Sequence, residues 1–306
     1  MKSLRIHEYG GSLNIDEIAE PTAGPGQVLV RVIATSFNPI DPGRASGNMR
    51  QMFPLVLPWI PGGDISGVVE AIGPGVTEFA VGDEVFGYSP GGGAYAERIA
   101  IGQESVVIKP PSLSNETAAA IAVVGQTAVQ SVLAANLHAG QTILIHGGSG
   151  SVGTLAIQVA HNQGVRVLTT AMNVHKSALL KLGVDMVIDY SGSRFEELIE
   201  PVDAVLDLVG GDVQQRSYGV IKPGGILVAA NQPPDPKECE AHHIRGIMVE
   251  TEVTAAGLKD FADQVAAGVI IPVVDHTETL WNPAGIWARR PAGSVLGKIV
   301  FSLNLP

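Results

Sequence analysis

Cysteine is nearly absent from this chain, since Cys239 is the single one among 306 residues. A lone cysteine excludes an internal disulfide framework and any zinc lobe built from several cysteines, and it fits a reducing compartment. Long apolar runs are also missing: none reaches the ~18 residues of a membrane span, and the charged start Met1 to Glu8 lacks the apolar stretch of a signal peptide. We therefore expect a globular, cytoplasmic protein without a membrane partner.

Positive charge is scarce, with 19 Lys and Arg against 30 Asp and Glu and a net charge of -11. This balance disfavours nucleic acid and anionic membrane surfaces as partners. The eight histidines show no metal-ligand spacing, and the adjacent His242 and His243 stand in a polar stretch typical of solvated loops. Any anion that the protein binds must therefore be held by a local group of residues.

One such group follows an apolar strand, where Gly148, Gly150 and Gly153 are spaced G-x-G-x-x-G and a helical pattern begins. The first glycine would permit a tight turn, the second would let the backbone approach a pyrophosphate, and the third would let the helix pack closely on the sheet. The helix start also offers free N–H groups to phosphates. An ordinary glycine-rich turn is the alternative. The predicted cofactor-binding residues here are Gly148, Ser149, Gly150, Ser151, Val152 and Gly153.

The pattern along the chain changes twice. Up to about residue 110, short β-branched segments punctuated by Gly and Pro predict a β-barrel. An Ala-rich helix from the N-cap Ser114 follows, and strands and helices then alternate, which predicts parallel strands with right-handed crossovers. From residue 272 the sequence again shows the pattern of the barrel segment. We predict an α/β protein with a barrel domain at 1–113 and 272–306 and a dinucleotide-binding domain at 114–271.

Six segments, in one order along nearly the whole chain, carry a resemblance to a known family. They are Phe37–Asp41, Pro61–Asp64, Gly82–Gly87, Gly93–Glu97, the glycine turn and Val202–Gly211. With them the chain resembles the zinc-free quinone oxidoreductase branch of the medium-chain dehydrogenase/reductase superfamily. The resemblance implies a GroES-like barrel, a Rossmann domain with a doubly wound parallel sheet, and a cofactor cleft between them. It further implies a homodimer paired through the edge strand near Ile247, and NADPH-dependent reduction of quinones or of C=C bonds conjugated to a carbonyl.

The residues themselves argue against zinc. The zinc-dependent alcohol dehydrogenases of this superfamily have a Cys ligand three residues before an Asp and a His ligand directly after a glycine. Asn38 and Gly63 stand in those places. A carboxamide is a poor zinc ligand and glycine has no side chain, so the usual tetrahedral ligand set is missing. We expect catalysis without a metal.

The end of the second strand of the dinucleotide-binding domain lacks an acid. An NAD-binding domain normally has Asp or Glu there to hold the ribose hydroxyls, whereas Thr170 to Lys176 contains none. Thr170, Asn173 and Lys176 could instead bind a 2′-phosphate, which favours NADPH. As alternatives, Asn173 caps the next helix and Lys176 is solvated. Tyr190 resembles the family residue that packs on the adenine, although a core or surface tyrosine is the competing interpretation.

Three further residues are expected near the nicotinamide. The resemblance places Thr127 beside it, just before a helix whose first turn could face the cofactor, with helix capping as the alternative. Val209 and Gly210 follow a strand that should end in the cleft, where open α/β sheets bind ligands. A plain connection from strand to helix is the competing interpretation for these two.

Two residues are candidates for chemistry. Hydride transfer to an enone or quinone builds negative charge on an oxygen, and that charge needs hydrogen-bond donors. Asn38 can offer an amide N–H and is the leading candidate, against a structural Asx turn before Pro39. Asp41 is a weaker candidate for an acid, against a carboxylate that stabilises the barrel.

The chain departs from the family at two places. Pro42 and Gly43 replace an aromatic residue and a longer polar one, which could widen the substrate pocket. Residues 281–291 are interrupted by two prolines where an amphipathic helix is common, so we expect an irregular loop there, with its tryptophans packed on the barrel or lining a pocket. These departures motivate a second hypothesis, a non-catalytic NADPH-binding redox sensor or structural homologue.

Overall fold

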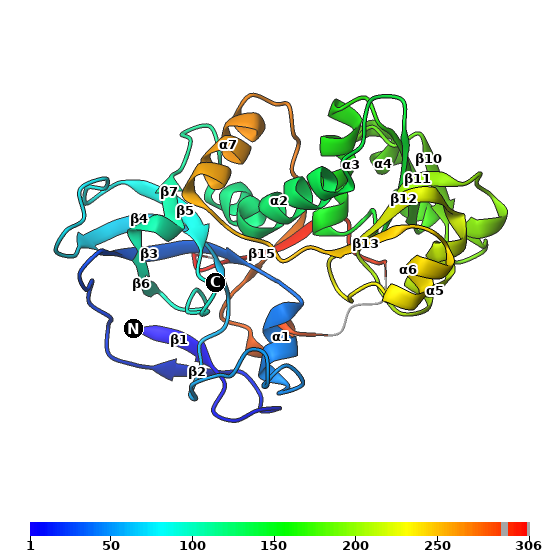
Figure 1. The fold of residues 1–306 in the computed structure, drawn as a ribbon. Helices are drawn as coiled ribbons and strands as arrows, with labels where there is room; N and C mark the ends of the chain where they lie inside the picture. The colour runs from blue at the N-terminus through cyan, green and yellow to red at the C-terminus, as the bar shows by residue number, and fades with distance from the viewer. Residues whose placement is uncertain (289–292, 305–306) are drawn as a thin grey trace.

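The computed structural model of the chain describes residues 1–288 and 293–304. It shows two lobes, a β-rich lobe and a lobe of alternating strands and helices, with helix α2 lying between them (Figure 1). A six-stranded parallel sheet and a seven-stranded, mostly antiparallel sheet form the two lobes. This mixed α/β architecture confirms the predicted fold class.

The parallel sheet has the doubly wound order. Its strands are β8 (Thr142–His146), β9 (Arg166–Ala171), β10 (Met186–Asp189), β11 (Val202–Asp207), β12 (Ile221–Ala229) and β13 (Arg245–Met248). They lie in the order β10-β9-β8-β11-β12-β13, which is the 3-2-1-4-5-6 order of a Rossmann domain. The strand order reverses between β8 and β11, so ligands are expected at the carboxyl ends of these two strands.

Helices cover both faces of this sheet (Figure 1). They are α2 (Asn115–Ala135), α3 (Ser151–Asn162), α4 (Lys176–Lys181), α5 (Asp212–Ser217) and α6 (Pro236–Ala241), with the 3-10 turns η2 (Asn173–His175), η3 (Phe195–Glu197) and η4 (Tyr218–Val220). Helix α7 (Ala255–Ala266) packs instead on α2. Alternate residues of β8 enter different cores: Ile143 and Ile145 pack with residues of α2 and α3, whereas Leu144 packs with residues of η4 and α6. This two-sided burial explains the continuous apolar run of the strand.

Two helix starts follow from capping. The hydroxyl of Ser114 accepts from the backbone N–H of Thr117 at 3.1 Å, as predicted. Helix α6 was not predicted, although its signal is in the sequence. Asp235 accepts from the backbone N–H of Lys237 at 2.8 Å, and Pro236 occupies the first helical position.

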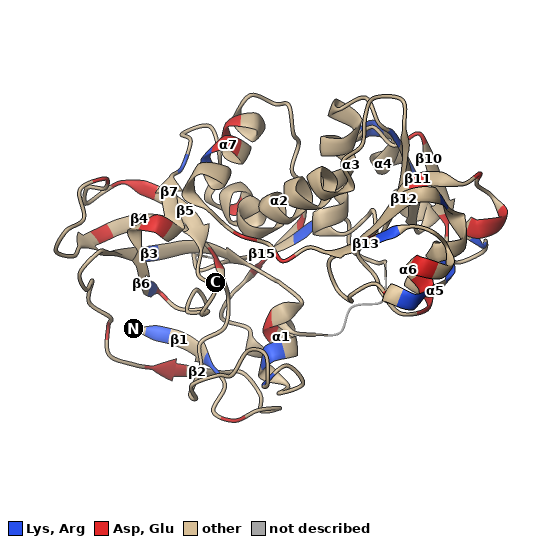
Figure 2. Cartoon of the chain, in the orientation of Figure 1, with Lys and Arg blue, Asp and Glu red and all other residues tan. Residues whose placement is uncertain are grey.

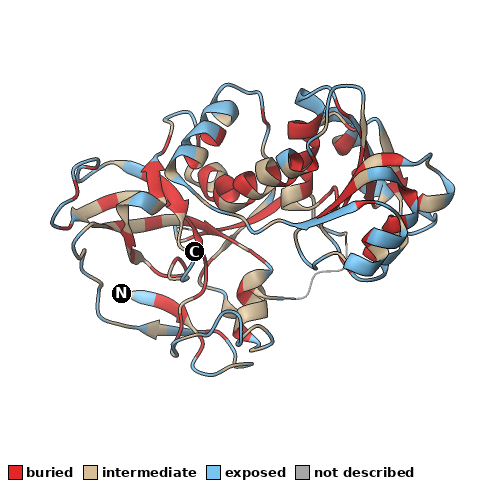
Figure 3. Ribbon diagram, in the orientation of Figure 1, coloured by how far each residue is buried: buried red, intermediate tan, exposed pale blue. Residues whose placement is uncertain are grey.

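Helix α2 is the one helix of the described residues with the length and apolar character to cross a membrane. However, 67% of its apolar window is buried inside the protein. It packs against α3 and α7 and against barrel strands, including β3 and β4. Figure 3 shows buried positions along it. We assign α2 as the core helix that joins the two lobes.

The barrel lobe contains β3 (Gln27–Ser36), β4 (Asp64–Ile72), β5 (Glu84–Tyr88), β6 (Arg98–Gly102), β7 (Val106–Ile108), β14 (Val274–Thr279) and β15 (Lys298–Ser302), with the hairpin β1 (Lys2–Arg5) and β2 (Asn14–Glu17) and the short helices α1 (Ile40–Ala45), η1 (Gln103–Ser105) and α8 (Pro283–Ile286). The tail strand β15 pairs antiparallel with β3. The tail therefore joins the barrel sheet, while the domain boundaries, 1–113 with 272–306 and 114–271, stay a prediction.

The expectation of an irregular loop at 281–291 is wrong in part. Residues Pro283–Ile286 form α8, because proline is tolerated in the first turn of a helix. Trp281 and Trp287 pack against the core that contains Tyr95, and the indole N–H of Trp281 donates to the carbonyl of Leu303 at 3.3 Å. Residues 289–291 of this segment lie outside the described part of the chain. These contacts support the interpretation that the two tryptophans pack on the barrel.

Charged residues of both signs are distributed over the two lobes (Figure 2). Arg98 of β6, for example, pairs with Glu70 at 2.7 Å, and Arg216 of α5 pairs with Glu196 at 2.8 Å. The basic side chains are thus interspersed with acidic ones. No extended basic face that would suit a polyanion is visible among the described elements in this view.

Candidate functional site

The glycine turn at the end of β8 is shaped by close backbone contacts. A Cβ on Gly148 would lie 1.9 Å from the hydroxyl oxygen of Thr169, and one on Gly153 would lie 2.3 Å from the carbonyl oxygen of Gly147. A Cβ on Gly150 would meet only that same carbonyl oxygen, at 3.3 Å. The second and third glycines therefore fit their predicted roles of open backbone and close packing.

The first glycine does not fit the predicted role. Gly147 has the positive φ of 76° that makes the tight turn, and Gly148 is required only because β9 lies too close for a side chain. The G-x-G-x-x-G motif pointed to Gly148 because a sequence motif gives the spacing of glycines but not their backbone conformation. We correct the prediction accordingly.

Helix α3 begins within this turn without a side-chain cap. Its N-cap is Gly150, whose carbonyl accepts from Thr154 at 2.9 Å. Ser151 and Val152 form the first turn of this twelve-residue helix and are half-buried, whereas Ser149 is buried. An uncapped helix start of this kind presents N–H groups and a positive dipole end to an anion.

Thr170 lies at the end of a strand, as predicted, but its hydroxyl is engaged within the protein. It is buried at the end of β9, and its hydroxyl lies 3.0 Å from Nδ1 of the buried His146. Nε2 of His146 lies 3.0 Å from the hydroxyl of Ser217, which itself donates to the carbonyl of Val213 at 2.7 Å. Ser217 must therefore accept from Nε2–H, which leaves Nδ1 to accept from Thr170. Because its hydroxyl is engaged in the core, we withdraw Thr170 from the phosphate-binding set.

Burial lowers the pKa of His146 to about 3, with a smaller contribution from the charge of Arg216. The imidazole is therefore neutral at physiological pH. Its ring also packs edge-on against Phe195, with ring centroids 4.6 Å apart. This arrangement joins β8, β9 and α5 directly beneath the glycine turn, a structural role that sequence reasoning missed.

Asn173, Lys176 and Tyr190 lie at the carboxyl ends of β9 and β10 and are exposed. No side chain caps η2 or α4, so the capping alternative for Asn173 does not hold. Tyr190 is 45% exposed, and its hydroxyl lies so near Gly293 that a Cβ there would approach it to 2.0 Å. These three side chains remain available to a ligand on the surface.

Thr127 lies in the middle of α2, so the prediction that it stands just before a helix is wrong. The helix begins at Asn115, twelve residues before Thr127, and intrahelical bonds therefore occupy the backbone of Thr127. Its hydroxyl lies 2.9 Å from the carbonyl of Val123, to which it donates, and 2.8 Å from the hydroxyl of Thr251. Thr251 follows β13, so Thr127 still lies near a carboxyl end of the sheet.

The connection after β11 carries Val209 and Gly210, as predicted. Both backbone N–H groups donate to Oδ1 of the buried Asp207 at 2.9 Å. Gly210 has a φ of 82°, which glycine adopts without strain, and Val209 is 50% exposed. The turn thus presents an apolar side chain close to the reversal point of the sheet.

Asn38 lies within a buried group of polar residues, which we call the junction cluster: Ser36, Asn38, Asp64 and Lys298. Oδ2 of Asp64 accepts from Nδ2 of Asn38 at 2.7 Å and from the hydroxyl of Ser36 at 2.5 Å. Nζ of Lys298 lies 2.5 Å from Oδ1 of Asn38 and 3.4 Å from Oδ2 of Asp64. Oδ1 of Asp64 accepts from the backbone N–H of Val123 in α2 at 2.9 Å. The cluster therefore bonds the barrel to the first part of α2.

The junction cluster is also connected to the glycine turn. The N–H of Gly297, directly before Lys298, donates to the carbonyl of Ser149 at 2.7 Å, and Gly297 forms a β-bridge with Gly150. Two residues of the tail, Gly297 and Lys298, therefore connect the glycine turn to Asn38. Asp64 and Lys298 were not predicted, although Asp64 lies in the segment Pro61–Asp64, because a charged residue within a strand pattern does not reveal its partner.

Asp41, in α1, is buried next to this cluster. Its Oδ1 accepts from the backbone N–H of Gly62 at 3.2 Å, and its Oδ2 is buried without a hydrogen-bond partner. Burial, together with the nearby charge of Asp64, raises the pKa of Asp41 to about 7, although the Gly62 hydrogen bond, Lys298 and Arg44 oppose the rise. A carboxyl group with this pKa is partly protonated at neutral pH, as a proton donor must be.

Two tyrosines fill the space beside Asp41. A Cβ on Gly63 would lie 2.3 Å from the ring of Tyr88, and one on Gly62 would lie 2.2 Å from the ring of Tyr95. Tyr95 is fully buried. The position where zinc-dependent relatives have a histidine ligand therefore has no room for a side chain. Among residues 1–288 and 293–304, no three His, Cys, Asp or Glu residues group as metal ligands do.

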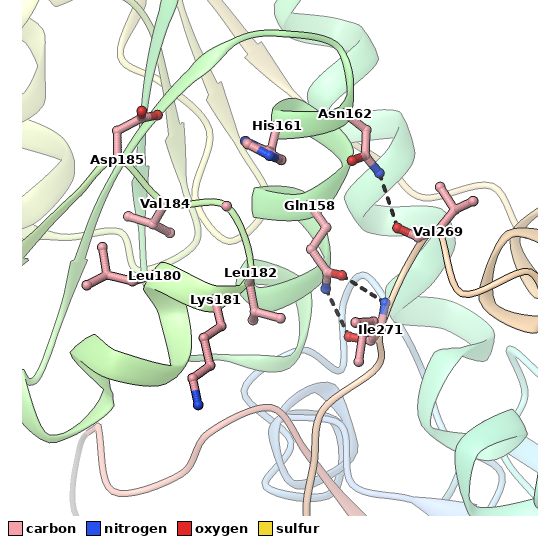
Figure 4. A pocket seen from close by; sticks show the side chains of 11 residues that line it. Gln158, His161, Asn162, Leu180, Lys181, Leu182, Val184, Asp185, Val269 and Ile271 are labelled. Carbon is pink, nitrogen blue, oxygen red and sulfur yellow. Dashed lines mark hydrogen bonds between the residues drawn. The ribbon is translucent and has the colours of Figure 1, made fainter.

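A surface hollow of about 400 Å³ lies along the later turns of α3, away from the glycine turn (Figure 4). The amide of Gln158 spans part of it, accepting from the N–H of Ile271 at 2.8 Å and donating to its carbonyl at 2.9 Å. The hollow marks the seam where the chain leaves α7 and crosses α3. We assign it no ligand.

The combination of a barrel, a Rossmann domain and a glycine turn bonded to a buried polar cluster defines a two-domain, dinucleotide-dependent oxidoreductase. Residues 24–112 match the family model "Alcohol dehydrogenase GroES-like domain", and residues 151–258 match "Zinc-binding dehydrogenase". The chain belongs to the quinone oxidoreductase branch of the medium-chain dehydrogenase/reductase superfamily, as the motifs predicted.

Known relatives cover most of the chain. The "2-methylene-furan-3-one reductase" of Solanum lycopersicum is 32% identical over 292 residues, which are 90% of this chain and 71% of that protein. The "NADPH-dependent alkenal/one oxidoreductase, chloroplastic" of Arabidopsis thaliana is 30% identical over 288 residues, 90% of this chain and 72% of that protein. The solved structure of the quinone oxidoreductase from Coxiella burnetii superposes with a TM-score of 0.90 at 30% identity and covers 99% of both chains.

Proposed function

We propose that this protein is a zinc-independent, NADPH-dependent reductase of quinones or of the C=C bond of α,β-unsaturated carbonyl compounds. One observation carries the proposal: the buried carboxyl of Asp41, with an unpartnered Oδ2, lies beside a cluster that is bonded to the glycine turn. The names of the relatives, which are quinone and alkenal/one reductases, support the same reaction class. Family membership alone would not distinguish the residues that carry out the chemistry.

The residues present fit NADPH. The open backbone at Gly150 and the uncapped start of α3 suit a pyrophosphate. Asn173 and Lys176 suit a 2′-phosphate, and Tyr190 offers a partly exposed ring to the adenine. Asp189, the last residue of β10, accepts hydrogen bonds from the hydroxyl and the backbone N–H of Ser191 at 2.7 and 3.0 Å. When bound, NADPH supplies the hydride.

Asn38 and Asp41 then have separate roles in the proposal. Each amide nitrogen carries two hydrogens, and Nδ2 of Asn38 uses one of them on Asp64, which leaves the second for the substrate oxygen that becomes negative. Asp41 supplies the proton that completes the reduction. One hydride and one proton are thus added across the double bond or the quinone.

Zinc independence follows from the ligand positions. Asn38 is engaged with both Asp64 and Lys298, and the ring of Tyr88 excludes a side chain at position 63. A cationic lysine would also repel a metal ion at this position. Negative charge on the substrate is therefore stabilised by hydrogen bonds in this proposal.

The experiment is a turnover assay of purified protein. We expect loss of NADPH absorbance with a quinone, a 2-alkenal or an alkenone, at a rate unchanged by prior treatment with a zinc chelator. Tight NADPH binding without turnover of any of these acceptors would instead support the non-catalytic redox sensor. Activity that a chelator abolishes and zinc restores would overturn zinc independence.

Lys176→Ala is expected to raise KM for NADPH about tenfold, because it removes one charged contact to the 2′-phosphate. The KM for NADH should stay unchanged, since NADH lacks that phosphate. Lys181→Ala is the matched control, because Lys181 is an exposed lysine at the other end of α4. Equal effects on the two cofactors would contradict the assigned role of Lys176.

A homodimer and a cytoplasmic location complete the proposal. Strand β13 is the outer strand of the Rossmann sheet, and its residues are exposed, including Ile247 at 38% and Met248 at 38%. An exposed apolar edge strand is suited to pairing with a second copy. The single, buried Cys239 fits a reducing compartment. Sedimentation analysis would measure the oligomeric state.

A further inference from the structure

We infer that Lys298 is a positioning residue of the reaction, which orients the Asn38 carboxamide toward the substrate and places a positive charge beside the developing oxyanion. The inference rests on the proposed function and names a residue that neither the motifs nor the comparisons single out. It is argued from the contacts of Lys298, from the backbone that fixes it, and from the charges around it.

The contacts of Lys298 determine the orientation of Asn38. A lysine ammonium is only a donor and a carboxylate is only an acceptor, so Oδ1 of Asn38 must face Lys298 and Nδ2 must face Asp64. Because Oδ1 and Nδ2 of Asn38 are both fixed in this way, the second N–H of Nδ2 points in a single direction. A donor whose amide oxygen accepts from a cation is also polarised toward stronger donation. Without Lys298 the carboxamide could rotate and offer the oxygen instead.

The backbone fixes Lys298 relative to the cofactor turn. Gly297 has a φ of 88°, and a Cβ on it would lie 2.1 Å from the carbonyl oxygen of Val273. The N–H of Lys298 donates to that same carbonyl at 2.9 Å, while Gly297 donates to Ser149 in the glycine turn. The ammonium is therefore held by the element that contacts the cofactor turn, and the side chain is only 3% exposed.

The charges around Lys298 come from three elements. Asp64 of β4 pairs with it, Asp41 of α1 lies close enough to interact, and Tyr88 of β5 interacts with both of these carboxyl groups. Burial lowers the pKa of Lys298, whereas Asp64 and Asp41 oppose the change. The charge of Lys298 in turn lowers the pKa of Asp41, as does that of Arg44. Lys298 therefore affects both the donor and the proposed acid.

Lys298→Met tests the inference. We expect kcat to fall 10- to 100-fold while the Kd for NADPH, measured by fluorescence titration, changes less than twofold. The loss of activity at alkaline pH should move to higher pH, because Asp41 loses a charge that lowers its pKa. Lys222→Met is the matched control, since Lys222 forms a 2.9 Å ion pair with Asp203 on the surface.

A double-mutant cycle separates positioning from a merely structural role. In an Asn38→Ala background, Lys298→Met should lower kcat by much less than it does in the wild type. A kcat loss of equal size in both backgrounds, or an unchanged kcat in folded Lys298→Met, would overturn the inference. If Lys298→Met does not fold, Lys298→Gln, which also removes the positive charge, takes its place in the cycle with the same criteria. A wild-type protein without turnover would overturn the proposed function itself and this inference with it.

Discussion

Asp41→Asn is expected to lower kcat by about 10²- to 10⁴-fold, the range that general acid catalysis contributes. The substitution keeps an acceptor for the N–H of Gly62 and removes only the titrating proton. In the wild type, activity should fall as pH rises through about 7, since burial raises the pKa of Asp41 to that value and the protonated form is the active one. The variant should lose this dependence. Steady-state kinetics between pH 5 and pH 9 measure both effects.

Asp41→Asn is expected to lower kcat but to raise the stability of the protein, and the same raised pKa of Asp41 is the reason. Between the ordinary pKa near 3.8 and the folded value of about 7, the folded protein holds a proton that the unfolded chain has released. The free energy of unfolding therefore decreases as pH rises through this range and stays reduced above it. One pKa unit corresponds to about 1.4 kcal/mol, so the reduction is on the order of 4 kcal/mol at pH 8.

Asparagine does not titrate, so Asp41→Asn should be more stable than the wild type at pH 8 and about equally stable at pH 4. Urea unfolding at the two pH values measures this difference. The combination of higher stability and lower kcat would exclude misfolding as the cause of lost activity. Asp83→Asn is the matched control, because Asp83 also accepts a backbone N–H, that of Ala80 at 2.8 Å, but lies near the surface. An Asp41→Asn enzyme with wild-type kcat and pH profile would remove Asp41 from the mechanism.

Gly153→Val is expected to destabilise the protein by about 3 kcal/mol or more, because the new side chain would overlap the backbone of the glycine turn. Its Cβ would lie 2.3 Å from the carbonyl oxygen of Gly147 and 2.8 Å from the Cα of Gly148, neither of which is a flexible side chain. Helix α3 would have to move away from β8. NADPH binding should be lost together with stability, as measured by urea unfolding and fluorescence titration.

Gly150→Ala should separate these two effects. Position 150 has a φ of -73°, which alanine adopts freely, and the nearest atom to a Cβ is 3.3 Å away. We expect stability within about 0.5 kcal/mol of the wild type. The methyl group would occupy the surface where the pyrophosphate approaches the backbone, so affinity for NADPH should fall about tenfold, as for the loss of one charge-assisted hydrogen bond.

Gly219→Ala is the control for both glycine variants. Gly219 is an exposed residue of the same domain with nothing within 4 Å of its Cβ position. It should change neither stability nor affinity. If Gly150→Ala binds NADPH as the wild type does, the glycine turn does not hold the pyrophosphate as proposed.

Local patterns predicted much of the fold because they depend on neighbours in sequence. The alternation of strands and helices after the Ala-rich helix depends on periodicity, and the Ser114 cap depends on residue type, both of which a single sequence contains. Helix α6 was missed although Asp235 and Pro236 signal it, because only six residues follow the cap. The position of Thr127 was wrong because a motif was placed at a helix start that lies twelve residues earlier.

The sequence by itself determined the class of protein, the dinucleotide turn and the missing zinc ligands, since each depends on residue type at short spacing. Only the tertiary structure decided which polar groups are free. In the structure, Thr170 contacts His146 and the Oδ2 of Asp41 has no hydrogen-bond partner. Lys298 contacts Asn38, from which it is 260 positions away in the sequence. Such contacts join residues far apart in sequence, and the burial that raises the pKa of Asp41 comes from all the elements packed around it.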